Sequence, residues 1–119
     1  MITEKVRACW NKNADTWTLL ARASYDVYRD FLNTPAFMKM LPPVEGLVGL
    51  DIGCGEGENT RKLAARGAKV HAIDISHIFV RHADAYRLDD IPDINYAVAN
   101  ALQLPFADSA FDFVTGFMS

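Results

Sequence analysis

The spacing of apolar residues near the start of the chain predicts an amphipathic helix. Val6, Trp10, Trp17 and Leu20 recur at three- and four-residue spacing or multiples of it, which places them along one stripe of a helix. We therefore expect this helix to pack through that stripe. A second, short helix is expected over residues 35–41, because a proline suits its first turn and two further prolines follow its end.

From about residue 44 onward, short apolar runs alternate with helical segments. The alternation predicts βαβ units and a parallel sheet, in which right-handed crossovers place three strands side by side and the fourth returns beyond the first. The expected strand order is 3-2-1-4, a Rossmann-like α/β fold, with a ligand site at the carboxyl ends of strands one and four. The expected strands are residues 47–52, 69–75, 94–99 and 111–118, and the helices between them are residues 58–67 and 77–88.

A glycine turn separates the first strand from its helix. Gly53, Gly55 and Gly57 allow positive φ and close approach of a ligand, and amide groups at a helix start favour an anionic group. Glu58 stands where a dinucleotide fingerprint has its third glycine. We expect Glu56 and Glu58 to repel a pyrophosphate, so a ligand with one carboxylate and a nearby positive charge suits the turn better. The alternative is a tight turn with no ligand.

An acidic residue ends the second strand. Asp74 is expected to lie beside the glycine turn, where a carboxylate can accept hydrogen bonds from both hydroxyls of a ribose. Its alternative role is to cap the next helix, although Ser76 already offers a capping hydroxyl.

Charge and composition limit the kinds of binding partner that the sequence suggests. Twelve Lys and Arg against fifteen Asp and Glu give a net charge of −3, so nothing signals a nucleic-acid partner. No apolar run has the length of a membrane span or the form of a signal peptide, and we expect a cytoplasmic protein. The cysteines and histidines show no metal-ligand spacing. Cys54 is not expected to be a nucleophile, although its place at a helix start would lower its pKa.

These motifs together resemble the class I S-adenosylmethionine-dependent methyltransferases, and within them the methyltransferase type 11 group. The resemblance implies an amino-terminal helical cap or lid over residues 1–43 and a Rossmann-like cofactor-binding domain over residues 44–119. It rests on residues 50–57, Asp74, residues 100–102, 104–106 and 111–112, and more loosely on residues 10–14, 35–37 and 41–43.

The resemblance also implies which residues meet the methionine half of S-adenosylmethionine. Gly53, Cys54 and Gly55 would line it, and Asp51 would approach its ammonium group. Phe117 would bring a backbone carbonyl and an aromatic ring to the same part, where a ring face attracts the cationic sulfonium.

The adenosine half has its own set of implied residues. Asp74 would take the ribose hydroxyls, and Ile75 would lie against the adenine ring. Asn100 and Ala101 would meet the adenine edge, with an amide at Asn100 where many relatives carry an aspartate. Gly57 completes the cofactor-binding turn.

The function that this resemblance implies is methyl transfer to an unidentified small molecule. Two alternatives stay open: an NAD(P)-dependent oxidoreductase, opposed by Glu58 and the acidic turn, and a module that binds the cofactor without turnover. No catalytic residue is assigned. Trp10, Trp17 and Tyr25 are expected either to form a lid over the pocket or to pack within the helical segment.

The fourth predicted strand has an unusual setting. Relatives of this class have a longer sheet, so we expect the 119 residues to represent an amino-terminal, cofactor-binding half that is truncated after this strand. The strand would then be an apolar edge, and such an edge favours a homodimer or a swapped pairing. A monomer seen by light scattering at micromolar concentration would contradict this expectation.

Overall fold

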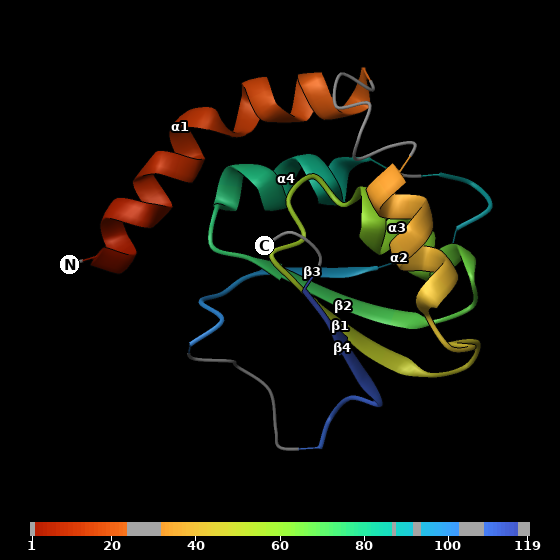
Figure 1. Ribbon diagram of the computed structural model, residues 1–119. Coiled ribbons are helices and arrows are strands. Elements are labelled where there is room, and N and C mark those ends of the chain that lie inside the picture. The colour runs from red at the N-terminus through yellow and green to blue at the C-terminus, as the bar shows by residue number, and fades with distance from the viewer. Residues whose placement is uncertain (1, 24–31, 87, 92–93, 103–108, 117–119) are drawn as a thin grey trace.

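The computed structural model describes residues 2–23, 32–86, 88–91, 94–102 and 109–116. Within these residues the chain forms four helices and four strands (Figure 1). The helices are α1 (Ile2–Arg22), α2 (Thr34–Met40), α3 (Glu58–Ala65) and α4 (His77–Ala85), and the strands are β1 (Val48–Ile52), β2 (Lys69–Asp74), β3 (Asn95–Val98) and β4 (Phe113–Thr115).

The strands form one parallel sheet in the order β3-β2-β1-β4, which confirms the predicted fold class and strand order. The register places Asp51 of β1 between Ala72 of β2 and Thr115 of β4. Because the strands run in the same direction, their carboxyl ends meet at one edge of the sheet. The segments that leave this edge are the ones that the sequence singles out as a ligand site.

Some elements are shorter than predicted. β4 covers Phe113–Thr115 rather than residues 111–118, of which residues 117–118 lie outside the described part of the chain. Just before β4, the Asp112 carboxylate accepts the Val48 amide at 2.8 Å, so a side chain takes the place of a backbone acceptor there. α4 ends at Ala85 rather than Leu88, because the next residue is already extended.

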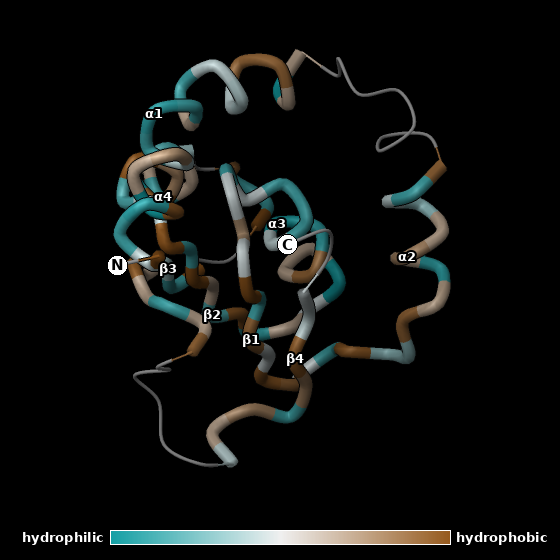
Figure 2. Tube along the Cα trace, turned by 60° about the vertical axis from the view of Figure 1, so that its left-hand side comes forward, coloured by the Kyte–Doolittle hydropathy of each residue, from teal (hydrophilic) through white to brown (hydrophobic). Residues whose placement is uncertain are grey.

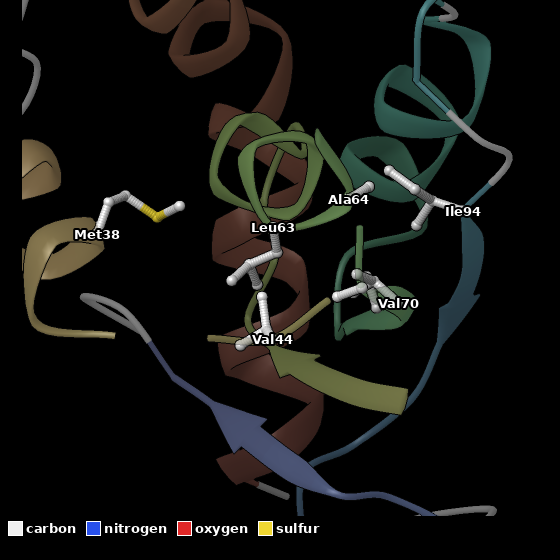
Figure 3. Packing of buried hydrophobic residues seen from close by; sticks show 8 residues of the cluster. Met38, Val44, Leu63, Ala64, Val70 and Ile94 are labelled. Atoms are coloured by element: carbon white, nitrogen blue, oxygen red, sulfur yellow. The ribbon is translucent and has the colours of Figure 1, made fainter. Parts of the chain in front are cut away.

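The hydrophobic core lies between the sheet and helices α2 and α3. Figure 1 shows these two helices and α4 on one side of the sheet. Leu63 of α3 packs in one cluster with Val44 and with Val70 of β2 (Figure 3). Hydrophobic residues recur along the strands (Figure 2). The ring of Phe113 lies so close to Gly49 that a Cβ there would come within 2.2 Å of it. The sheet therefore needs glycine at this position.

The predicted first helix is confirmed as α1, but the predicted packing face is wrong. The buried residues of α1 are Ala14, Thr18 and Ala21, whereas Trp10 and Trp17 are 42% and 51% exposed. The buried stripe of α1 thus consists of small side chains, and Trp10 lies beside it with its ring centre 6.0 Å from that of Phe79 in α4. The stripe of large apolar residues consequently lies to one side of the contact.

None of the described helices is long and apolar enough to cross a membrane. The cytoplasmic location stays a prediction. At the β4 edge, Val114 is exposed, and the pairing of this edge with a second chain also stays a prediction.

Candidate functional site

The glycine turn lies at the carboxyl edge of the sheet, directly after β1. Gly53, Gly55 and Gly57 have φ values of 71°, 56° and 94°, so the predicted left-handed backbone is confirmed. The amides of Gly53 and Cys54 donate to the Ile73 carbonyl at 2.9 and 3.0 Å, and the Gly57 amide donates to the Cys54 carbonyl at 3.0 Å. These backbone hydrogen bonds hold the turn against the end of β2.

Two glycines of the turn face different surroundings. A Cβ at Gly57 would lie 2.7 Å from the Tyr96 hydroxyl and 2.9 Å from Nη1 of Arg61, whereas a Cβ at Gly55 would meet nothing within 4 Å. Tyr96 supports the turn from β3, and burial raises the pKa of Tyr96 to about 12, so its phenol stays neutral. Gly57 is therefore packed by the protein, while Gly55 opens onto free space that a ligand can enter.

Asp74 lies beside the turn, as predicted. Its Oδ2 accepts the Gly55 amide at 2.9 Å, and its Oδ1 accepts the Ser76 amide at 2.9 Å. Burial raises the pKa of Asp74, while these amide donors oppose the rise. Asp74 does not cap α4, because Ser76 does so by accepting the Phe79 amide at 3.2 Å. A carboxylate has about four acceptor sites, so Asp74 keeps acceptor capacity for a ligand hydroxyl beside these amides.

Asp51 is a buried carboxylate near the end of β1. Its two oxygens accept the hydroxyls of Thr60 at 2.6 Å and Thr115 at 3.0 Å, and burial raises its pKa. Among the described residues no cation forms an ion pair with it. A buried anion without a cation is costly, which makes this carboxylate a suitable partner for a cationic group that a ligand brings.

The expectation for Glu56 is wrong, because its carboxylate does not face a ligand as a free charge. Glu56 is buried, and its Oε2 accepts from Arg61 at 2.8 Å and from Arg22 of α1 at 3.2 Å. Both guanidinium groups also lie 4.4 Å from the centre of the Tyr86 ring. Two arginines compensate the charge of Glu56, so its repulsion of a pyrophosphate carries no weight against a dinucleotide. The missing third glycine, with Glu58 in its place, remains an argument against a dinucleotide.

The expected effect on Cys54 also has the opposite sign. Burial raises the pKa of the Cys54 thiol well above its ordinary range, and the nearby carboxylates of Asp74 and Asp51 add to the rise. The thiol makes a weak hydrogen bond with the Gly55 carbonyl at 3.6 Å. Desolvation and negative charge outweigh the helix start here, and Cys54 is a small neutral residue of the turn.

The predicted adenosine-side residues follow β2 and β3 at the same edge. The Ala99 amide donates to the Asp74 carbonyl at 3.0 Å, which ties the two segments together. Asn100 accepts the Leu102 amide at 3.0 Å with its Oδ1, and Ala101 lies in that turn. Ile75 follows Asp74 directly. Phe117 lies outside the described residues.

Sequence reasoning missed the residues of α1 that reach this edge. Nε of Arg7 donates to the Ile75 carbonyl at 3.2 Å, and Oδ1 of Asn11 accepts from the Ser76 hydroxyl at 2.6 Å. Both pairs are far apart in sequence, and no local pattern marks them. Thr115 was missed as well, although a parallel register between β1 and β4 is enough to place it beside Asp51.

The aromatic side chains of α1 and the possible metal ligands were the remaining candidates from the sequence. Trp10 packs at a tilt against Phe79, with ring centres 6.0 Å apart, which favours the packing alternative for this residue. Tyr25 lies outside the described residues, and whether Trp17 belongs to a lid stays a prediction. In the part of the chain that the structure describes, no three His, Cys, Asp or Glu side chains gather as metal ligands.

A family model described as a methyltransferase domain matches residues 50–119, more than half of the chain. Among solved structures, an S-adenosylmethionine-dependent methyltransferase from Mesorhizobium loti is similar, with 34% identity and a TM-score of 0.62. That match covers 69% of this chain and 38% of the other.

Two curated relatives are named as methyltransferases of small molecules. The chain is 40% identical over 78 residues to 27-O-demethylrifamycin SV methyltransferase of Amycolatopsis mediterranei, covering 63% of this chain and 29% of that protein. It is 33% identical over 98 residues to demethylmenaquinone methyltransferase of Renibacterium salmoninarum, covering 76% and 40%. The chain thus spans less than half the length of these relatives, and none of them supports the oxidoreductase alternative.

Proposed function

This chain belongs to the class I S-adenosylmethionine-dependent methyltransferases, and we propose that its strand edge holds the cofactor while the methyl group passes to a small-molecule acceptor. The observation that carries the proposal is the pair of carboxylates at the ends of β1 and β2. Asp51 has no cationic partner among the described residues, and Asp74 has acceptor capacity left for hydroxyl groups. S-adenosylmethionine would supply an ammonium group to the first and ribose hydroxyls to the second. In this proposal residues 44–119 bind the cofactor and residues 1–43 cover it.

Asp51 is suited to the ammonium group of the methionine part. Its carboxylate is buried and receives two hydroxyl hydrogen bonds, but no described cation pairs with it. A ligand ammonium nearby, directly or through a water molecule, would stabilise the ionised form and lower the raised pKa of Asp51. Gly53, Cys54 and Gly55 would lie beside the same part of the ligand, and the open space at Gly55 is consistent with this.

Asp74 is suited to the ribose. Its oxygens have acceptor capacity beyond the amides of Gly55 and Ser76, and a ribose offers two neighbouring hydroxyls. Adenine would then lie against Ile75, with Asn100 and Ala101 at its edge. Phe117 would meet the methionine part, and Gly57 would complete the cofactor-binding turn.

Catalysis in this proposal depends on placement. The bound cofactor supplies a methyl group activated on a sulfonium. An in-line displacement needs the acceptor atom close and aligned, and holding both partners in place lowers the barrier without a protein nucleophile. The neutral thiol of Cys54 agrees with this, because it does not compete as a nucleophile for the methyl group. We assign no general base.

Calorimetric titration with S-adenosylhomocysteine tests the proposal. We expect micromolar binding to the 119-residue chain and no binding of NAD. Asp74→Ala should weaken binding by about 100-fold or more, because two hydrogen bonds to a charged acceptor are lost. Asp90→Ala, at an exposed turn, is the matched control and should bind as the wild type does. Binding of NAD instead, or equal affinity in Asp74→Ala, would contradict the proposal.

A transfer assay separates the enzyme from a module that only binds. Labelled S-adenosylmethionine incubated with a panel of phenolic, quinone and amine acceptors should label at least one of them. Persistent absence of transfer despite measurable cofactor binding would favour the non-catalytic alternative.

A further inference from the structure

Helix α1 contacts the segment that follows β2 at two successive residues. Arg7 donates from Nε to the Ile75 carbonyl at 3.2 Å, and Asn11 accepts the Ser76 hydroxyl at 2.6 Å. Arg7 and Asn11 lie one helical turn apart, so they share a face of α1. This face is therefore placed against the residues on either side of the ribose-binding position.

Ser76 connects that contact to Asp74. Ser76 is fully buried, and its hydroxyl oxygen accepts the Phe79 amide at 3.2 Å as the cap of α4. A serine hydroxyl has one proton to donate, and Asn11 is the acceptor that receives it. The Ser76 amide in turn donates to Oδ1 of Asp74 at 2.9 Å. The hydroxyl and the amide of Ser76 thus each have a fixed hydrogen-bond partner.

The sequence of hydrogen bonds continues through Asp74 into the glycine turn, where Oδ2 accepts the Gly55 amide at 2.9 Å. A continuous chain therefore runs from Asn11 through Ser76 and Asp74 to Gly55. A carboxylate held on both oxygens cannot rotate freely, and the lone pairs that it keeps for a ligand have fixed directions. Those directions decide how well the ribose hydroxyls are received.

We propose that Asn11 is a positioning residue for the cofactor ribose, acting through Ser76 on the orientation of Asp74. The inference rests on the proposed function and goes beyond it, because it assigns a role in ribose recognition to a helix outside the α/β domain. Without the Asn11 acceptor, the buried Ser76 hydroxyl loses its partner and Ser76 must shift to find another. In this proposal that shift also displaces the Ser76 amide, on which Oδ1 of Asp74 depends.

The test compares two asparagines of the same helix. Asn11→Leu removes the acceptor, whereas Asn13→Leu makes the same change at an exposed position of α1. Asn11→Asp keeps an acceptor oxygen and is expected to rescue. Asp15→Leu removes a different contact of α1, the 2.6 Å pair with His82 of α4, and controls for looser docking of the helix.

Ligand discrimination is the first readout. The affinity for S-adenosylhomocysteine is compared with that for its 2′-deoxyribose analogue. In the wild type, in Asn13→Leu and in Asp15→Leu, we expect the analogue to bind about tenfold more weakly, as for the loss of one hydrogen bond to a charged group. In Asn11→Leu the two ligands should bind within about threefold of each other, and S-adenosylhomocysteine itself should bind about tenfold more weakly.

Amide hydrogen exchange without ligand is the second readout. Exchange at Ser76 and Gly55 should quicken by about tenfold in Asn11→Leu relative to Asn13→Leu, and Asn11→Asp should restore protection. Unchanged discrimination and unchanged exchange in a folded Asn11→Leu would overturn the role of Asn11 alone. A wild type that does not bind S-adenosylhomocysteine would overturn the proposed function first, and the exchange arm would then still report whether Asn11 orders Asp74.

Discussion

The glycine turn and helix α1 meet at the same strand edge but are held in different ways. The turn is fixed mainly by backbone hydrogen bonds, such as those of Gly53 and Cys54 to the Ile73 carbonyl, and the Asp74 carboxylate adds one at the Gly55 amide. α1 is fixed by side chains, with Asn11 and Arg22 among its anchors. Backbone geometry follows from local sequence, whereas side-chain anchoring depends on partners that are distant in sequence. This difference separates the part of the site that could be predicted from the part that could not.

The strongest prediction concerns the junction of the two regions. Glu56→Gln leaves the guanidinium of Arg61 buried without an anionic partner, and we expect a loss of about 3 kcal/mol in the free energy of unfolding. Arg22→Gln removes only the partly exposed arginine, and the expected loss is about 1 kcal/mol or less. Urea unfolding of both variants measures the difference. Equal losses would show that α1 and the turn contribute alike to the cluster.

Within the turn, two glycines with positive φ should respond differently to alanine. Gly55→Ala introduces backbone strain of about 1 kcal/mol and no clash. Gly57→Ala adds contacts with Tyr96 and with Arg61, which Glu56 holds in place, so we expect a loss of about 2 kcal/mol.

The two variants should rank in the opposite order for cofactor affinity, with the larger loss at Gly55. A methyl group at Gly55 would fill the space assigned to the ligand, so Gly55→Ala should weaken S-adenosylhomocysteine binding more than Gly57→Ala does. Thermal unfolding together with calorimetry measures both effects. A parallel loss of stability and affinity in the two variants would contradict the assignment of that space.

The packing face of α1 predicts a third contrast. Ala14 is fully buried and Trp17 is half exposed, so Ala14→Gln should cost about 2 kcal/mol, whereas Trp17→Gln should cost less than about 0.5 kcal/mol. Chemical denaturation of the two variants decides between this face and the stripe of large apolar residues. A larger loss at Trp17 would restore the face that hydrophobic spacing predicts.

These contacts explain why the fold was predictable from the sequence and the docking of α1 was not. The strand order and the place of Asp74 depend on alternation of strands and helices and on crossover handedness, which a sequence displays directly. Glu56 pairs with Arg61 nearby in the chain, but its second ion pair is with Arg22, which is far away in the chain. Large apolar residues on α1 suggested a packing surface, yet the residues that are buried are small ones such as Ala14. Spacing locates a helix but does not decide which face is buried when both are partly apolar.

The smallest expected effect on stability is at Asp51, and it depends on pH. Burial raises the pKa of Asp51 above its ordinary value of 3.8, so the folded chain without ligand binds this proton more tightly than the unfolded chain does. The stability contributed by protonation is present at low pH and is lost as pH rises through the folded pKa. Asn at this position keeps partners for Thr60 and Thr115 without a charge.

Asp51→Asn should therefore be more stable than the wild type at pH 7, and the difference should shrink as pH falls toward 4. Asp74 titrates in both proteins, and because its charge also raises the pKa of Asp51, the difference reports Asp51 together with this coupling. The same variant should bind S-adenosylhomocysteine about tenfold or more weakly, because the ammonium loses its charged partner. Urea unfolding across this pH range checks the first effect and calorimetry the second. A wild type that is the more stable of the two at pH 7 would contradict the buried, unpaired state of Asp51.

The most direct measurement is a crystal structure of the chain with S-adenosylhomocysteine bound. The account predicts the ribose hydroxyls on the two oxygens of Asp74 and the ligand ammonium within reach of Asp51, directly or through one water molecule. A ligand whose sugar lies away from Asp74, or one bound elsewhere on the molecule, would contradict it.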